Sequence, residues 1–539
     1  MPEVDAEVPV LVVGAGPTGL AATIGLARCG VRSVTIERHP GTSIHPKARG
    51  VNVRTMEIFR GWGIDEAVRR AGLSSASNGF FYRGETLLAE SFERVGGGGL
   101  AADAESFSPE SWLVIAQDVL EPVLLEAARD SALTDVRFGQ ELIELSADDG
   151  NISAVVRDRS TGEVVRIRAD WVIGADGADS PVRAAAGLGL VGHGPLVDNV
   201  SILFEAPLAP LVADRLSAVY YLTRDPSERP RGHPMSVGNP PYDGVILAID
   251  NAERWLLVVG EALTDVDEAE ARARVHRALG RDDIPVDIKG LMAWAPAARV
   301  AERYRAGRLF IAGDAAHQMT PSGAFGLNVG IADAQNLAWK LGWVERGWAG
   351  EGLLDTFDSE RRPVGTFATD QSHQQFLGTR PAKPFGNWGV ILGAHYASSA
   401  VIPDGSSPTP LADPATEYLP EATPGSRAPH AWLRTSDGRA STLDLGRDGF
   451  AVLAGSAATD WDGDARAAAQ KSGLPLHSAR LGDGVEPEDP AAFERVYAIG
   501  DRGAVLIRPD GHVAWRTSSP RSESDFGIEG ILDQVLARA

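Results

Sequence analysis

The sequence predicts an α/β protein of several domains, and three observations support this prediction. The chain has 539 residues, which is more than a single hydrophobic core usually organises. Near the N-terminus, a helical pattern lies between two short apolar runs, Val10–Val13 and Ser33–Ile36, that are typical of buried parallel strands. In the middle of the chain, the strand-like runs Val245–Ile249 and Trp255–Val259 have no helical pattern between them, which indicates additional β structure.

The composition is that of an acidic globular protein. Hydrophobic residues make up 44% and charged residues 23% of the chain, and 73 acidic against 51 basic residues give a net charge of −22. Nucleic-acid binding is not expected, because it needs a basic surface, and the charge also disfavours anionic membranes. The single cysteine, Cys29, excludes an internal disulfide, a CxxC pair and a cysteine-rich zinc site. We expect a cytoplasmic protein that needs no metal.

One apolar segment near the N-terminus has the length of a membrane span. Residues 8–27 carry no charge, and a helix of this length would cross a bilayer. However, acidic residues precede the segment, and Gly14, Gly16, Pro17, Gly19 and Gly25 interrupt it. The segment is better explained as a buried strand, a tight turn and a helix.

The turn in this segment predicts a dinucleotide site in a Rossmann-like domain. Residues 14–19 have the pattern GxGxxG, and the next strand ends on Glu37, roughly 20 residues further along. Glycines let a pyrophosphate approach the backbone and the helix N-terminus, while the Glu37 carboxylate would accept hydrogen bonds from ribose hydroxyls. An acid here favours an unphosphorylated ribose, as in NAD or FAD. The residues assigned to this part of the site are Gly14, Gly16, Pro17, Thr18, Gly19, Glu37 and Arg38.

Two distant motifs decide between these cofactors. Residues 171–183 contain Asp176-Gly177, and residues 308–317 contain Gly313-Asp314. Together with the first turn, and in the same order, they resemble the motifs of the class A flavoprotein monooxygenases, which hydroxylate aromatic rings. The resemblance covers almost the whole chain and is greatest to bacterial aromatic polyketide hydroxylases. It implies FAD as the bound cofactor and NADPH or NADH as a transient co-substrate.

The resemblance also implies which further residues contact FAD. Asp314 would hold the ribityl chain, and the helix that begins after Pro321–Gly326 would direct its N-terminus at the flavin. Gln117 matches a cofactor-contacting glutamine, although a surface polar residue that opens a helix would look the same. Lys47 and Arg49 lie in the loop where the family has a cofactor-contacting arginine. That arginine aligns nearer Lys47, so this sequence departs from the family pattern. The complete set is Lys47, Arg49, Gln117, Asp176, Gly313, Asp314, Pro321, Gly323, Gly326, Leu327 and Asn328, whereas His317 is expected to be a structural hydrogen-bond partner.

The fold implied by the resemblance is α/β, with a Rossmann-like FAD-binding domain, an inserted β-sheet substrate domain and a C-terminal thioredoxin-like domain. The last domain follows a proline-rich linker and has no cysteine, which excludes dithiol chemistry. The expected boundaries are residues 1–75, 105–190 and 290–375 for the discontinuous FAD-binding domain, 76–104 and 191–289 for the insertion, 376–424 for a helical segment and linker, and 425–539 for the thioredoxin-like domain.

The implied activity is hydroxylation of an aromatic, polycyclic polyketide with NAD(P)H and dioxygen, through a C4a-hydroperoxide of the flavin. No side chain is assigned a catalytic role, because the flavin performs the oxygen chemistry. The residues that could line the substrate pocket are Tyr220, Tyr221, Met235 and Trp294, although a place in the core is the commoner role for any one such residue. Baeyer–Villiger oxidation, oxidative rearrangement and a non-catalytic flavin-binding partner protein remain alternatives, and a homodimer remains open.

Overall fold

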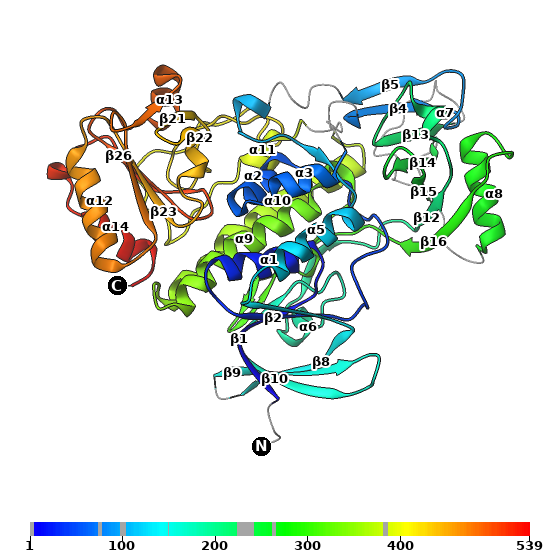
Figure 1. Cartoon of the computed structure of the whole chain (residues 1–539), viewed down its shortest axis with the longest axis horizontal. Helices are drawn as coiled ribbons and strands as arrows, with labels where there is room; N and C mark the ends of the chain where they lie inside the picture. The colour runs from blue at the N-terminus through cyan, green and yellow to red at the C-terminus, as the bar shows by residue number, and fades with distance from the viewer. Residues whose placement is uncertain are drawn as a thin grey trace.

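The computed structural model describes residues 5–73, 78–97, 104–148, 150–223, 242–260, 266–380 and 386–538. Figure 1 shows three parts: a central part built on a parallel sheet, a second sheet to one side of it, and the C-terminal domain on the other side. The chain leaves the central part to form the second sheet and then returns to it. The predicted α/β fold with an inserted sheet and a separate C-terminal domain is confirmed.

The central sheet is parallel over the strand order β19-β10-β1-β2-β7. Residues Val10–Val13 are all buried, as expected for a strand that is covered on both faces. The short strand β18 and the hairpin β8–β9 add antiparallel pairs at the margins. The bounds are β1 (Ala6–Val13), β2 (Ser33–Glu37), β7 (Thr134–Phe138), β8 (Gln140–Asp148), β9 (Asn151–Asp158), β10 (Val164–Gly174), β18 (Arg305–Ala306) and β19 (Leu309–Ile311).

Helix α1 (Pro17–Arg28) begins directly after the glycine turn and packs against α5 (Gln117–Arg129) and α9 (Gly326–Glu345). Helices α2 (Val53–Trp62) and α10 (Thr356–Phe376) also pack on α9, which is therefore buried over most of its length (Figure 1). Cys29 follows α1, and burial raises the pKa of its thiol to about 12, which keeps the thiol protonated at neutral pH. Across the described parts of the chain, no helix is both long enough and apolar enough to span a membrane.

The second sheet, here called the roof sheet, has seven strands in the order β16-β12-β15-β14-β13-β4-β5. One face packs against α8 (Glu268–Leu279) through a hydrophobic cluster. The opposite face carries a second apolar cluster that includes Ala116, the residue before α5. The bounds are β4 (Phe80–Gly84), β5 (Glu93–Gly97), β12 (Asn199–Glu205), β13 (Val219–Thr223), β14 (Tyr242–Ala248), β15 (Arg254–Val259) and β16 (Asp287–Trp294).

The C-terminal domain is built on a sheet in the order β24-β23-β26-β27, in which β23 and β24 are parallel and the other pairs are antiparallel. One face packs with α12 and α14, and α9 contributes Trp339 and Trp343 to that core. The other face packs with α13. The bounds are β23 (Phe450–Ala454), β24 (Leu476–Arg480), β26 (Ala504–Ile507), β27 (Val513–Thr517), α12 (Thr459–Ser472), α13 (Pro490–Tyr497) and α14 (Ile528–Val535), with a small flanking sheet of β21 (Trp432–Thr435), β22 (Gly438–Ser441) and β25 (Val485–Pro487).

Short elements connect these parts. Between residues 393 and 431 the chain forms no helix or extended strand, because prolines lack the N–H that regular structure needs. The helical segment expected for residues 376–424 is therefore limited, in the described chain, to the end of α10 and to α11. The connecting elements are β3 (Gly50–Val51), β6 (Leu113–Val114), β11 (Leu190–His193), β17 (Ala298–Ala301), β20 (His317–Gln318), α3 (Asp65–Ala71), α6 (Pro181–Ala185), α7 (Ala209–Val212) and α11 (Trp388–Leu392).

Candidate functional site

The glycine turn between β1 and α1 leaves the N-terminus of α1 open. Gly14 has a φ of 101°, and a Cβ there would lie 2.3 Å from the carbonyl oxygen of Ala175. A Cβ on Gly19 would lie 1.9 Å from the Gly14 carbonyl oxygen, whereas a Cβ on Gly16 would have nothing within 4 Å. No side chain caps the helix, whose first residue is Pro17. Uncapped N–H groups beside open space at Gly16 suit a phosphate.

Glu37 lies at the carboxyl end of β2, beside this turn. Its Oε2 atom accepts a hydrogen bond from the N–H of Ala15 at 2.9 Å. Its Oε1 atom accepts from the N–H of His39 at 2.9 Å and lies 2.6 Å from Nδ1 of His39. The carboxylate therefore braces the glycine turn from the position where a ribose would bind, while the neighbouring Arg38 is exposed.

The two acidic motif residues follow adjacent strands of the sheet. Asp176 follows β10; its Oδ2 accepts from the N–H of Val182 at 3.0 Å, and its buried Oδ1 has no partner among the described residues. Asp314 follows β19, and its side chain is exposed to solvent. The surrounding protein nevertheless removes part of the hydration of its carboxyl and raises its pKa, an effect that His317 and Lys47 partly offset. The Asp314 carboxylate is thus accessible but enclosed by protein, as expected for a ligand-binding acid.

Thr18 joins the glycine turn to the Gly313–Asp314 turn. Gly313 has a φ of 61°, and a Cβ there would lie 2.5 Å from the Oγ1 atom of Thr18. A Cβ on Gly330 would lie 2.4 Å from the same Thr18 oxygen. Glycine at both positions lets the two turns meet over the start of α9.

The turn before α9 leaves the N-terminus of this helix uncapped. Gly323 has a φ of 85°, and a Cβ on Gly326, the first residue of α9, would lie 4.0 Å from the Oδ1 atom of Asp314. No side chain caps α9, so its N–H groups remain available next to Asp314. Pro321 starts this turn, and Leu327 packs partly against the central core.

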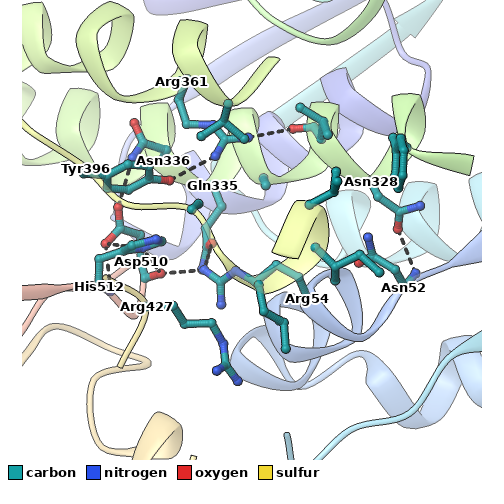
Figure 2. Close-up of a pocket in the computed structure, with 18 residues that line it drawn as sticks. Asn52, Arg54, Asn328, Gln335, Asn336, Arg361, Tyr396, Arg427, Asp510 and His512 are labelled. Carbon is teal, nitrogen blue, oxygen red and sulfur yellow. Dashed lines mark hydrogen bonds and ion pairs between the residues drawn. The ribbon is translucent and has the colours of Figure 1, made fainter. Parts of the chain in front are cut away.

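Asn328 uses its side chain within the protein. Its Oδ1 accepts from the N–H of Asn52 and from the hydroxyl of Thr55, both at 2.8 Å (Figure 2 shows the bond to Asn52). Its Nδ2 donates to the carbonyl oxygens of Gly50 at 3.0 Å and Ala324 at 2.8 Å. This placement makes Asn328 a clamp between α9 and α2, and any contact to a cofactor would come from its backbone.

The loop after β2 is tied to the first turn of α5. Gln117 donates to Glu121 at 2.7 Å, and the other carboxylate oxygen of Glu121 accepts from the N–H of Ser43 at 2.6 Å. Burial raises the pKa of Glu121, and the bond from Gln117 partly counters this effect. Lys47 is exposed on the loop and lies close enough to lower the pKa values of both Glu121 and Asp314.

Arg49 connects the same loop to the roof sheet. Its Nη1 donates to the carbonyl oxygen of Ala218, just before β13, at 3.1 Å. Its Nε and Nη2 atoms are buried and have no hydrogen-bond partner among the described residues. Burial lowers the pKa of Arg49 to about 10, although Asp118 and other groups oppose this shift.

The roof sheet turns one apolar face toward the central part. Tyr221 and Trp294 pack there against a cluster that contains Ala116, with Val119 of α5 at its edge. The indole N–H of Trp294 donates to the hydroxyl of Ser201 at 2.9 Å, which leaves the ring apolar toward the cluster. The structure therefore places both aromatic residues beside the first turn of α5, where Gln117 lies.

Tyr220 lies on the opposite face of the roof sheet. It is fully buried among residues that pack against α8, and its hydroxyl donates to the carbonyl oxygen of Arg215 at 2.9 Å. Consecutive strand residues point to opposite faces, so Tyr220 and Tyr221 cannot both line one pocket. This placement does not support a substrate contact for Tyr220, and Met235 lies outside the described residues.

Sequence reasoning missed Asp333 of α9 and Arg361 of α10. His317, expected to be a structural partner, is fully buried with its Nε2 atom 2.7 Å from Asp333. Asp333 in turn accepts a hydrogen bond from Nε of Arg361 at 2.8 Å. The available signal was an aspartate among the small and apolar residues Ile331, Ala332 and Ala334, since buried charges occur almost only in pairs.

A small cavity of about 30 Å³ lies beside α9, between α2, α11 and the C-terminal domain (Figure 2). A volume of this size holds about two water molecules. Its lining includes Arg54, Arg361, Tyr396, Asp510 and His512. The cavity is therefore too small for a cofactor and belongs to the contact between domains.

The residues at the carboxyl edge of the central sheet fit FAD. The open N-terminus of α1, Glu37 and the accessible carboxylate of Asp314 follow the carboxyl ends of three parallel strands of the central sheet, β1, β2 and β19. Ligands bind at these ends in open α/β sheets. Glycines at positions 16 and 326 keep the backbone accessible between them.

Comparison with known families agrees with this geometry. Residues 7–372 match the family described as "FAD binding domain". Residues 421–539 match the family described as "Aromatic-ring hydroxylase, C-terminal". Together the two matches cover the central part, the roof sheet and the C-terminal domain.

Individual relatives extend over the full chain. A putative polyketide hydroxylase of Streptomyces halstedii is 40% identical, over 98% of this chain and 97% of its own length. The flavin-dependent monooxygenase PieE, in complex with FAD and substrate, superimposes with a TM-score of 0.89 at 32% identity, over 100% of both chains. Aklavinone-11 hydroxylase, in a ternary complex with FAD and aklavinone, gives a TM-score of 0.85 at 33% identity, over 100% of both chains. The chain belongs to the aromatic-ring hydroxylases with an FAD-binding domain, and it is an FAD-dependent monooxygenase.

Proposed function

We propose that this enzyme hydroxylates an aromatic, polycyclic polyketide, with NAD(P)H as the electron donor and dioxygen as the source of the new hydroxyl. The observation that carries the proposal is the apolar inner face of the roof sheet, which packs against the start of α5, where the N–H of Gln117 bonds to the carbonyl oxygen of Ala48 in the loop after β2. An apolar wall of this kind suits a flat, largely hydrocarbon ring system and excludes water from it. Relatives named for polyketides support the substrate class.

The residues proposed to hold FAD span the carboxyl edge of the central sheet. The N-terminus of α1 would bind the pyrophosphate, Glu37 a ribose, and Asp314 the ribityl chain. The uncapped N-terminus of α9 would face the flavin ring and stabilise negative charge there. When bound, FAD supplies the redox and oxygen chemistry. The chain's own contribution is to bind, orient and keep the reacting ring dry.

Tyr221 and Trp294 are the side chains that we propose to contact the substrate. Both lie on the inner face of the roof sheet, and the Trp294 indole N–H is already bonded to Ser201. Their rings can therefore offer apolar faces to a planar substrate. Arg49, with two buried N–H groups that lack partners in the described chain, lies at the seam between this sheet and the cofactor loop.

The test is a turnover assay with a panel of aromatic polyketides. We expect NAD(P)H oxidation to accelerate when the correct substrate is added, and one atom of ¹⁸O-labelled dioxygen to enter the product as a hydroxyl. NMR of the product must show a new phenol. A lactone or a ring-opened acid would refute hydroxylation, and unlabelled product would refute oxygenation.

We also propose the following domain division, cellular location and assembly. The FAD-binding domain combines residues 1–75, 105–190 and 290–375, which supply the central sheet and its helices, and residues 425–539 form a domain without redox chemistry. Dependence on NAD(P)H favours action in the cytoplasm. Analytical ultracentrifugation of the FAD-loaded protein tests whether it is a homodimer.

A further inference from the structure

A chain of buried polar contacts begins at the Gly313–Asp314 turn. Asp333 accepts a hydrogen bond from the backbone N–H of Gly313 at 3.3 Å and pairs with His317 at 2.7 Å through the same Oδ2 atom. Its Oδ1 atom accepts from Nε of Arg361 at 2.8 Å. Asp333, His317 and Arg361 are all buried. The Asp333 carboxylate therefore ties the backbone of this turn to α10.

Arg361 continues the chain toward the C-terminal domain. Its Nη1 donates to the hydroxyl of Tyr396 at 3.0 Å, and its Nη2 donates to the carbonyl oxygen of Val329, in the first turn of α9, at 3.3 Å. The ring of Tyr396 stacks on His512 of the C-terminal domain, with centroids 4.0 Å apart and planes 22° apart. Figure 2 shows Tyr396 between Arg361 and the segment that carries His512. The Arg361 guanidinium thus contacts Asp333, the start of α9 and Tyr396, whose ring stacks on the C-terminal domain.

The charges favour this arrangement. Burial alone would raise the pKa of Asp333, but Arg361 and His317 together lower it below its ordinary value. Asp333 is therefore ionised and Arg361 is its counter-ion. Removing one partner from a buried, hydrogen-bonded pair leaves an uncompensated charge, so the pair strongly favours a single geometry.

We propose that Asp333 and Arg361 are positioning residues for FAD, and that Tyr396 and His512 make this positioning depend on the C-terminal domain. The inference rests on the proposed contact of Asp314 with FAD. Gly313 directly precedes Asp314 and has a φ of 61°, so its conformation sets the direction of the Asp314 carboxylate. Arg361 holds this turn through Asp333 and the flavin-facing end of α9 through Val329.

A thermodynamic cycle separates positioning from simple stabilisation. A contact that only stabilises the fold stabilises the apoprotein and the FAD complex equally, and its loss leaves the dissociation constant of FAD unchanged. A positioning contact keeps the apoprotein in the binding-competent conformation. Its loss raises the apparent dissociation constant in proportion to the fraction that leaves this conformation.

The decisive variant is Tyr396→Phe, which removes the hydroxyl that accepts from Arg361 and retains the ring that stacks on His512. Tyr304→Phe is the matched control: Tyr304 is fully buried, its ring centroid lies 6.2 Å from that of His317, and its hydroxyl has no hydrogen-bond partner among the described residues. We expect Tyr396→Phe to raise the dissociation constant of FAD on the order of tenfold, which corresponds to about 1.4 kcal/mol. The visible absorption bands of the bound flavin should also shift, and the control should change neither quantity.

A second pair of variants grades the effect at Arg361. Arg361→Lys keeps the charge beside Asp333 but cannot reach Tyr396 and Val329 together, whereas Arg361→Met removes the charge. FAD affinity should fall in the order wild type, Tyr396→Phe, Arg361→Lys, Arg361→Met. If Tyr396→Phe matches Tyr304→Phe in FAD affinity and in flavin spectrum, the inference is overturned. A wild-type protein that fails to bind FAD would instead refute the proposed function itself.

Discussion

Glu37 is the single residue on which retention of the adenosine half of FAD should depend most directly. We expect Glu37→Gln to weaken FAD binding by roughly 1–3 kcal/mol, because a charge-assisted hydrogen bond to a ribose is lost. The glutamine oxygen can still accept from the N–H of Ala15, so the glycine turn should persist. Titration of apoprotein with FAD, followed by flavin fluorescence, measures the change. Glu268→Gln, at the exposed first residue of α8, is the control, and equal affinities for both variants would contradict the assignment.

The Asp314 carboxylate should strengthen FAD binding and lower the stability of the apoprotein. Burial raises the pKa of its carboxyl, so the native apoprotein holds this proton more tightly than the unfolded chain. Stability is therefore lost as the pH rises from the ordinary aspartate range, about 3.9, through the raised pKa. At pH 7 we expect Asp314→Asn to raise the Tm of the apoprotein and to weaken FAD binding, with the gain in Tm shrinking as the pH falls. An apoprotein with a lower Tm and unchanged FAD affinity would exclude this role.

At the scale of elements, the two faces of the roof sheet pack against different parts of the protein. Tyr221 lies on the inner face and Tyr220 on the face that packs against α8. We expect Tyr221→Ala to raise the KM for the aromatic substrate roughly two- to tenfold, the loss of an aromatic contact worth about 0.5–1.5 kcal/mol. More NAD(P)H should also be consumed without product, because water enters the pocket.

Tyr220→Phe provides the comparison for this element. It removes a buried hydroxyl that donates to the carbonyl oxygen of Arg215 at 2.9 Å, and it should lower the Tm slightly while the KM stays unchanged. Steady-state kinetics and product quantification on both variants decide the matter. A larger effect on KM from Tyr220→Phe than from Tyr221→Ala would reverse the assignment of the two faces.

At the scale of the whole molecule, the C-terminal domain should not unfold separately from the FAD-binding domain. Trp339 and Trp343 of α9 belong to the core of the C-terminal domain. Arg508 of that domain forms buried ion pairs with Glu360 of α10 at 2.7 Å and with Asp510 at 2.5 Å. On heating, release of FAD and loss of the near-ultraviolet dichroism of tryptophan should therefore coincide. A C-terminal transition at lower temperature, with FAD still bound, would show independent domains.

The absence of cysteine after Cys29 has a consequence at this same scale. The C-terminal domain has a thioredoxin-like sheet, yet it can exchange no thiol with a disulfide. We expect the full-length protein, with or without bound FAD, not to catalyse the reduction of a protein disulfide by a dithiol. Measurable reduction of a protein disulfide would contradict a purely structural role.

The sequence by itself determined the nucleotide fold and the cofactor. The strand, the glycine turn, the helix and Glu37 lie within one short stretch, so their spacing already specifies the local geometry. Asp314 could be recognised in the same way, because it ends an apolar strand and precedes a glycine-rich helix start. Each of these signals depends on residues that are near neighbours in the chain.

Only the tertiary structure decided which polar and aromatic residues support the site. Tyr220 and Tyr221 are adjacent in sequence, and the choice of inner face depends on which side of the sheet α8 covers. The sequence did not show that the side-chain amide of Asn328 bonds to α2 and the loop before it. The contacts among Asp333, Arg361, Tyr396 and His512 join three distant segments, and a hydrogen bond between such segments leaves no periodic pattern in the sequence. Local spacing therefore specified a dinucleotide site, the resemblance of the distant motifs specified FAD, and only packing between domains revealed the residues that we propose to position it.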